Sequence, residues 1–278
     1  MIKKKKSGGR RIKKVLKWVL ITFLVIVTSI ATIILYPQPL FANKIEYRQF
    51  KVYSNDKIGN EINPVLDSAV SLVKNSELYD STYKVDIFFA PNTFFNKLDS
   101  KVFGKGPTAR ATDNNLVIKV QVEINKRLAY TTFHKPCQQD LAYVIAHEMI
   151  HCLQMHKYGI LKFNPFKHPE MWKLEGYPEY IARQKYSEPN YSLKKDIERF
   201  IELNRKQTDI WISVEEGGCE APEYYYKGRL MIEYLVNVKH LTYDQILKDK
   251  RLEEEIYTEM AGWANKQDMP AAINQQLK

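Results

Sequence analysis

Two histidines and a glutamate are spaced for metal chemistry in the segment His147-Glu148-Met149-Ile150-His151. Residues four apart lie one turn apart on the same face of a helix, so both imidazoles can reach one ion. Glu148 lies next to His147 on that turn, where it can act on a water as a general base. The alternative is a pair of hydrogen-bonded core histidines, but burying these three polar groups in an apolar helix without an ion is costly. The spacing therefore predicts a catalytic zinc site with His147 and His151 as ligands and Glu148 as the catalytic base.

The segment around this motif has the pattern of a helix over residues 138–158. Apolar side chains recur at spacings of three and four, and Gly159 follows as a stop signal. Cys152 faces a different side from His151 and is expected to pack into the core. His156 is expected to be an exposed histidine of the last turn, favoured there by the helix dipole.

A catalytic zinc ion needs a third protein ligand, and the best candidate lies in residues 171–182. Trp172, Glu175 and Gly176 form a Trp-x-x-Glu-Gly element that resembles the second motif of the gluzincin metallopeptidases. The resemblance implies a zincin-like metallopeptidase fold and makes Glu175 the third zinc ligand. The spacing from the first motif is longer than in aminopeptidase-like members, so Glu179, one turn on, remains the alternative ligand.

Residues 224–235 resemble a later helix of membrane-associated members of that group, in which a tyrosine or histidine faces the zinc. On this resemblance, Tyr226 and Arg229 are the candidates for stabilising the oxyanion of the reaction, a role that suits a phenol or a guanidinium. Three consecutive tyrosines leave the choice open, and packing in the core is the alternative for each. The resemblance also suggests that residues 108–112 form a sheet edge that holds extended peptide by strand addition; an ordinary solvated strand is the alternative.

The elements that must position these residues follow an α+β order. A helix is predicted over residues 63–75, a strand over 84–90, and a hairpin from strands 108–112 and 116–123. From residue 138 onward the pattern is helical, with breaks near 159–169, 187–190 and 217–218.

The N-terminus has the pattern of a membrane anchor. Residues 1–17 form a basic tail with nine of the 42 Lys and Arg residues, and residues 18–36 are an apolar run without a charge. Such a run spans the hydrocarbon core as a helix, and the basic tail favours a cytoplasmic N-terminus. A cleaved signal is the alternative, although Leu40-Phe41-Ala42 matches a cleavage site only in part. Residues 37–60 are predicted as a juxtamembrane linker and 61–278 as the zincin-like domain.

The remaining composition restricts the function. Without the tail, 33 basic residues face 32 acidic ones, which disfavours a nucleic-acid binder. Cys137, Cys152 and Cys219 are too few for a disulfide framework, and the sequence does not assign a single bridge. We therefore expect a zinc-dependent hydrolase of the cell membrane, with a peptide or protein as substrate, cleaving peptide bonds outside the cytoplasm. The alternative is a membrane-tethered binding or assembly protein with a non-catalytic zinc site.

Overall fold

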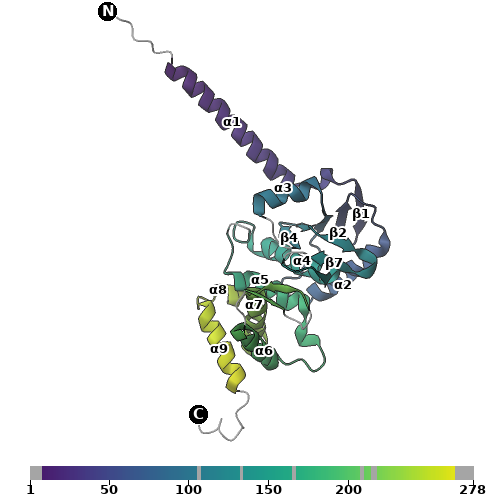
Figure 1. Cartoon of the computed structure of the whole chain (residues 1–278), viewed down its shortest axis with the longest axis vertical. Coiled ribbons are helices and arrows are strands. Elements are labelled where there is room, and N and C mark those ends of the chain that lie inside the picture. The colour runs from purple at the N-terminus through teal and green to yellow at the C-terminus, as the bar shows by residue number, and fades with distance from the viewer. Residues whose placement is uncertain are drawn as a thin grey trace, which may run out of the picture.

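The computed structural model describes residues 8–104, 108–131, 134–164, 167–206, 210–213 and 218–266. A long N-terminal helix leads into a body of mixed helices and strands (Figure 1). The predicted α+β class is confirmed at this level, whereas the zincin-like fold stays a prediction.

Helix α1, Gly8–Leu35, contains the predicted anchor. Residues 12–35 form one helix that is long and apolar enough to cross a membrane, and its side chains stand almost entirely clear of the body. The helix begins ten residues before the predicted span, within the basic tail, and ends one residue before Tyr36. Residues 1–7 of the tail lie outside the described part of the chain.

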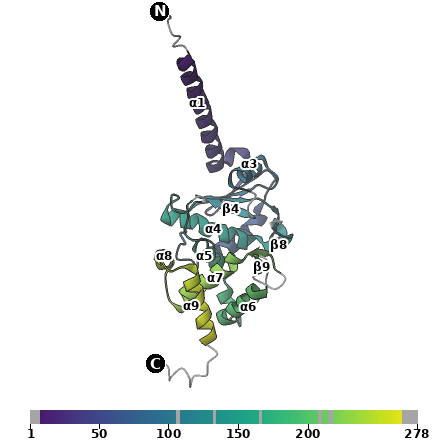
Figure 2. The same ribbon diagram turned by 60° about the vertical axis from the view of Figure 1, so that its left-hand side comes forward.

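A five-stranded sheet forms the half of the body next to α1 (Figures 1 and 2). In spatial order its strands are β1 (Asn43–Tyr47), β2 (Phe50–Ser54), β3 (Val85–Phe89), β5 (Asn115–Ile118) and β4 (Ala109–Thr112). The pairs β2–β3 and β3–β5 are parallel, while the pairs β1–β2 and β5–β4 are antiparallel. The segment 37–60 is thus not simply a linker, because it supplies two strands of the sheet.

The helices of the body pack on one face of this sheet and beyond it (Figure 1). They are α2 (Asn63–Val73), α4 (Leu141–Tyr158), α5 (Met171–Arg183), α6 (Leu193–Lys206), α7 (Glu223–Glu233), α8 (Tyr243–Lys248) and α9 (Glu253–Lys266). A π-helical stretch, Tyr234–Val238, extends α7. The other face of the sheet carries α3 (Phe94–Phe103), which the sequence analysis did not predict.

The local predictions were right for the strongly patterned segments. Helix α2 and strand β3 lie within their predicted ranges, and β4 pairs with β5 across the predicted hairpin turn. Asp113 adopts φ 53° in that turn, a left-handed conformation that aspartate tolerates well. The predicted second strand of the hairpin, residues 116–123, was too long. In the structure this segment divides between β5 and β6 (Gln121–Glu123).

Two predictions for the second half of the chain were wrong. Residues 138–140 are not helical: they belong to β8 (Cys137–Asp140), which pairs with β7 (Leu128–Thr131), and β7 pairs with β6. Nor is the rest entirely helical, because β9 (Trp211–Ser213) pairs with β10 (Glu220–Pro222). Of the predicted break at 217–218, Gly217 lies outside the described residues.

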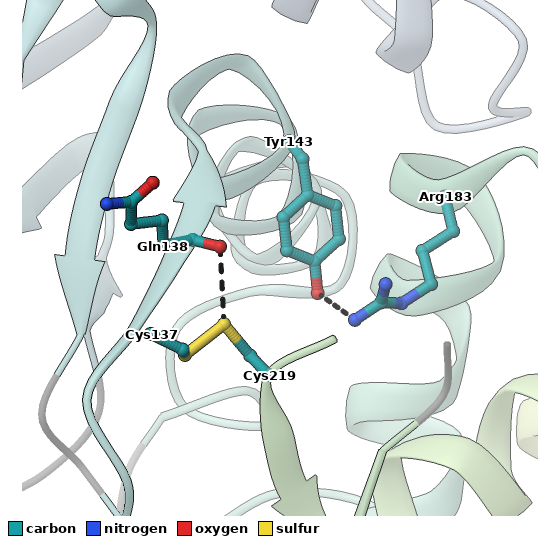
Figure 3. The surroundings of a disulfide bond; sticks show 5 residues. All are labelled: Cys137, Gln138, Tyr143, Arg183 and Cys219. Carbon is teal, nitrogen blue, oxygen red and sulfur yellow. Dashed lines mark hydrogen bonds between the residues drawn. A yellow bond between two sulfur atoms is a disulfide. The ribbon is translucent and has the colours of Figure 1, made fainter. Parts of the chain in front are cut away.

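A disulfide joins Cys137 on β8 to Cys219, directly before β10 (Figure 3). The sulfur of Cys219 also lies 3.4 Å from the carbonyl oxygen of Gln138. Cys152 is a free, fully buried thiol in the core, as expected. The bridge closes a loop that contains all of α4, α5 and α6, and in the chain-entropy view so long a closure stabilises the fold by about 4 kcal/mol.

Candidate metal centre

Helix α4 carries the His-Glu-x-x-His motif through the middle of the molecule. Asp140 begins it, because its carboxylate accepts a hydrogen bond from the backbone N–H of Tyr143 at 3.0 Å. Gly159, at φ 88°, ends it as predicted. The helix is buried on nearly all sides, between the sheet and α5, so its three polar residues are held inside a packed environment. His156, in the last turn of the helix, is instead exposed, and its Nε2 lies 3.5 Å from Oδ2 of Asp80.

Three donor atoms from α4 and α5 meet at one point. Nε2 of His147, Nε2 of His151 and Oε2 of Glu175 are each 3.2 Å from the other two. Two ligands of a tetrahedral zinc ion, each about 2.0–2.1 Å from the metal, are about 3.3 Å apart. The triangle therefore has the dimensions of one face of a zinc coordination shell. The side chains stay 10%, 14% and 12% exposed, so one side of the set remains open.

The orientation of His151 is fixed by an amide. Gln154 donates from Nε2 to the carbonyl of Leu174 at 3.2 Å and to the hydroxyl of Tyr243 at 2.8 Å. A carbonyl can only accept, so Oε1 of Gln154 must face Nδ1 of His151, 2.9 Å away, and that nitrogen carries the hydrogen. Nε2 of His151 is then left with its lone pair directed at the metal position. The carbonyl of Leu174 is available because Pro178, four residues later in α5, has no N–H to bond it.

The orientation of His147 is supported by a carboxylate. Its Nδ1 lies 3.2 Å from Oε1 of Glu179, a contact that is not aligned as a hydrogen bond and acts electrostatically. Tyr143 and Arg183 hold the same carboxylate. Burial alone would lower the pKa of His147, but the neighbouring carboxylates of Glu175 and Glu179 raise it to about 10. Of the two candidate ligands, Glu175 thus joins the donor set and Glu179 lies behind His147.

Glu148 differs from every other acid near the centre, because it has no hydrogen bond or ion pair to a described residue. It is 8% exposed and lies beside the donor set. Burial raises the pKa of its carboxyl, and the neighbouring histidines only partly oppose this. A carboxylate with a raised pKa and no partner is suited to accepting a proton from a bound molecule.

Helices α5 and α7 cross at two glycines beside the centre. A methyl group on Gly176 would lie 2.5 Å from the backbone of Gly228, and one on Gly228 would lie 2.9 Å from the carbonyl oxygen of Trp172. This close crossing brings the first turn of α7 to the metal centre. Tyr225, three residues before Gly228, has its ring centroid 6.0 Å from that of His147. Burial raises the pKa of Tyr225 well above its usual value, so its phenol stays protonated and can donate a hydrogen bond.

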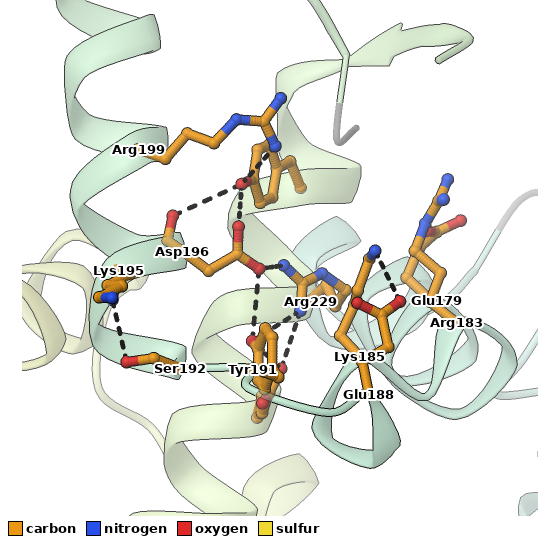
Figure 4. A network of polar contacts seen from close by, with 12 residues as sticks. Glu179, Arg183, Lys185, Glu188, Tyr191, Ser192, Lys195, Asp196, Arg199 and Arg229 are labelled. Carbon is orange, nitrogen blue, oxygen red and sulfur yellow. Dashed lines mark hydrogen bonds and ion pairs between the residues drawn. The ribbon is translucent and has the colours of Figure 1, made fainter. Parts of the chain in front are cut away.

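The two residues predicted to stabilise an oxyanion lie elsewhere. Tyr226 is one residue and about 100° further around α7, where its hydroxyl donates to Asp196 of α6. Arg229 is 1% exposed and binds Asp196, Glu233 at 2.8 Å and the hydroxyl of Tyr191 at 3.3 Å (Figure 4). Neither lines the space next to the donor set. The predicted placement of both beside the metal position was wrong, and Tyr225 is the tyrosine whose ring lies next to His147.

Two hollows open on either side of the donor set, and both are lined by Ala109, His147, Glu148 and Tyr225. The β8-side hollow, of about 620 Å³, is further lined by residues such as Gln139, Tyr143, Arg183 and Glu220. The α5-side hollow, of about 880 Å³, is further lined by residues such as Phe103, Arg110, Phe163, Met171 and Leu174. Strand β4 passes between them as the edge strand of its sheet.

No protein-family model matches this sequence, and no curated protein is significantly similar to it. The chemistry of the centre is therefore inferred from its own residues. His147, His151 and Glu175 together form a group that could hold a metal ion. Sequence reasoning found these three and Glu148, but it missed Gln154 and Tyr225, whose positions depend on the packing of α4, α5 and α7.

Proposed function

We propose that the protein is a zinc-dependent hydrolase, and specifically a membrane-anchored peptidase that acts outside the cytoplasm. The observation that carries this proposal is the triangle of donor atoms, 3.2 Å on each side, with the unpartnered Glu148 beside it. Two imidazoles and one carboxylate with an open side are the ligand set of catalytic zinc, whereas a purely structural site is closed by four protein ligands. Such a structural site has no need of an additional buried carboxylate.

Zinc, when bound, supplies a Lewis acid that polarises a carbonyl and makes water acidic. Glu148 takes a proton from the attacking water and delivers it to the leaving nitrogen, a task helped by the raised pKa of its carboxyl. Tyr225 donates a hydrogen bond to the oxygen of the carbonyl under attack. The free edge of β4, between the two hollows, is suited to hold an extended peptide by main-chain hydrogen bonds.

Two features support a location outside the cytoplasm. The apolar α1 follows a basic N-terminal tail, an arrangement that favours retention of that tail on the cytoplasmic side. The disulfide between Cys137 and Cys219 belongs to an oxidising environment, which the cytoplasm does not ordinarily provide.

The test compares the full chain, purified in detergent, with Glu148→Gln. Zinc content is measured by mass spectrometry, and hydrolysis is measured on unfolded casein and on a mixture of internally quenched peptides. We expect about one zinc ion per chain in both proteins and a loss of hydrolysis of about 10²- to 10⁴-fold in the variant. A matched control is Glu202→Gln, on the exposed side of α6, which should keep both properties.

The outcomes separate the candidate functions. Equal hydrolysis by wild type and Glu148→Gln would contradict catalysis at this centre. Stoichiometric zinc without hydrolysis of any substrate would favour the tethered binding protein. Absence of zinc would remove the metal centre altogether.

A further inference from the structure

The side of α3 that faces away from the sheet carries an unusual mixture of residues. Phe94 is 66% exposed there, with the exposed Lys97 and Lys101 beside it, and Val102, at the end of the helix, is 39% exposed. The only acid of the helix, Asp99, is fully buried on the opposite side. Apolar and basic residues without an acid on one side of a helix are typical of helices that lie in the membrane interface.

This helix lies where α1 enters the body (Figures 1 and 2). The inner side of α3 covers the sheet through Phe95, which packs with Phe88 of β3 and Val117 of β5. Ile33 of α1 and Phe41 pack against the same cluster. The end of the apolar helix and α3 therefore cover one face of the sheet together, and the helices with the metal centre lie on the other face.

The junction between α1 and the body is fixed by direct contacts. Ile34 is 6% exposed, and Asn115 of β5 donates to the carbonyl of Leu35 at 2.8 Å. Gln38, three residues later, donates to Asp86 of β3 at 2.9 Å. No flexible spacer therefore separates the end of the apolar helix from the sheet, and a membrane crossed by α1 must lie close to α3.

We propose that the outer side of α3 is a membrane-contact surface that seats the body on the bilayer beside α1. This surface consists of the exposed Phe94, Lys97, Lys101 and Val102, continued by the exposed Leu40. The apolar side chains enter the interface and the two lysines face anionic headgroups. The inference rests on α1 spanning a membrane, as the proposed function has it, but does not depend on hydrolysis.

The surface has a consequence for the cleft. Helix α3 ends at Phe103, and Phe103 lines the α5-side hollow together with Arg110. Arg110 lies over the ring of Phe103, with 4.2 Å between its guanidinium carbon and the ring centroid. When α3 contacts the bilayer, the opening of the α5-side hollow lies next to the membrane. The hollow then faces polypeptide segments that lie near the membrane.

The test measures the surroundings of a spin label at position 102. The full chain with Val102→Cys is labelled and placed in nanodiscs of equal parts phosphatidylcholine and phosphatidylglycerol. The native cysteines do not interfere, because two form the disulfide and Cys152 is fully buried. The matched control is Leu252→Cys, also an exposed aliphatic site, at 64%, between α8 and α9.

Accessibility of the label to oxygen and to a water-soluble nickel complex gives the result. We expect the oxygen-to-nickel ratio to be several-fold higher at position 102 than at 252, because oxygen concentrates in lipid and nickel stays in water. Adding Lys97→Glu and Lys101→Glu should lower the ratio at 102. Low accessibility to both reagents at 102 would indicate a protein contact and overturn the proposal, as would equal ratios at the two positions.

The failures of the two proposals are distinguishable. A chain that is not retained in nanodiscs would refute the anchor and this surface together. A chain that is retained, with a water-like label at 102, would refute the surface alone. If the Glu148→Gln experiment refutes the peptidase proposal, the label result still stands, because the label reports contact with the bilayer and not hydrolysis.

Discussion

The cluster around Arg229 and the metal centre are both buried and polar, but they differ in how their charges are matched. In the cluster of α6 and α7, Arg229 donates to Asp196 (Figure 4) and to Glu233, so donors meet acceptors. In the metal centre, two imidazole nitrogens and a carboxylate oxygen converge on one another, and their other ring nitrogens already face acceptors. In the first cluster opposite charges are paired with one another, and only Nε of Arg229 lacks a hydrogen-bond partner among the described residues, whereas the second has the composition of a ligand shell.

This difference explains why Arg229 and Tyr226 were wrongly expected at the centre. Their residue types suit an oxyanion, but the hydroxyl of Tyr226 and one nitrogen of the Arg229 guanidinium bind the carboxylate of Asp196 on the neighbouring helix. The residue type of Glu148 suits a general base, and no described residue binds its carboxylate. A buried polar residue is therefore better assigned by what it leaves unmatched than by its type alone.

The largest expected effect is on stability, from Arg229→Met. Removing the guanidinium leaves the charge of Asp196 without its counterion and the carboxyl of Glu233 without its donor, which costs about 3–5 kcal/mol. Urea denaturation followed by circular dichroism measures this on the full chain in detergent. Arg251→Met, whose side chain is 40% exposed, is the control and should cost about 0–1 kcal/mol. The folded variant should still bind zinc; loss of zinc from it would mean that the two clusters are not independent.

The next prediction compares two neighbouring tyrosines, of which Tyr225 lies at the metal centre and Tyr226 in the cluster of α6 and α7. Tyr225→Phe should lower kcat by about 10²- to 10³-fold with little change in KM, as removal of one oxyanion donor does. Tyr226→Phe should leave kcat unchanged and lower the free energy of unfolding by about 1–3 kcal/mol, because Asp196 loses a donor. Steady-state kinetics and denaturation of both variants provide the measurement. The assignment fails if Tyr226→Phe is the variant that loses kcat.

A smaller effect is expected for Gln154→Leu. Without the amide oxygen, Nδ1 of His151 loses the acceptor that fixes its tautomer, and zinc affinity should fall about 10- to 100-fold. Competition with a fluorescent zinc chelator gives the affinity directly and needs no substrate. Gln184→Leu is the control, since Gln184 also donates to a backbone carbonyl, that of Leu72. Equal affinities for the two variants would exclude the proposed role of Gln154.

The parts of the centre that could be predicted are those fixed by local spacing. His147, Glu148 and His151 lie on one helix, so their relative placement follows from its pitch. Glu175 was found through a short motif. The choice of Tyr225 over Tyr226 depends on the angle at which α7 crosses α5, and the contact of Gly176 with Gly228 that sets this angle is not local in sequence.

The same limit applies to the fold. Residues 137–140, Cys-Gln-Gln-Asp, have little intrinsic strand preference and become β8 through pairing with β7. Strands β1 and β2 had a usable signal in the alternation around Ile45 and Val52, but their position between the anchor and a predicted domain favoured a linker. A segment next to a membrane helix should therefore be searched for strands before it is assigned as a spacer.

The smallest expected effect is on the pH dependence of the free energy of unfolding, and it arises from Glu233 in the cluster of α6 and α7. Burial raises the pKa of Glu233 to about 7, despite the opposing charge of Arg229, whereas an unfolded glutamate has a pKa of about 4.3. The folded state thus keeps a proton that the unfolded state releases, so this group stabilises the fold fully at low pH. That contribution is lost as the pH rises through 7, by about 2–3 kcal/mol between pH 5 and pH 8. Denaturation across this range should show a fall in wild type that is reduced by this amount in Glu233→Gln. Identical pH slopes in the two proteins would mean that Glu233 is already ionised in the folded cluster, which would then be a fully charged triad.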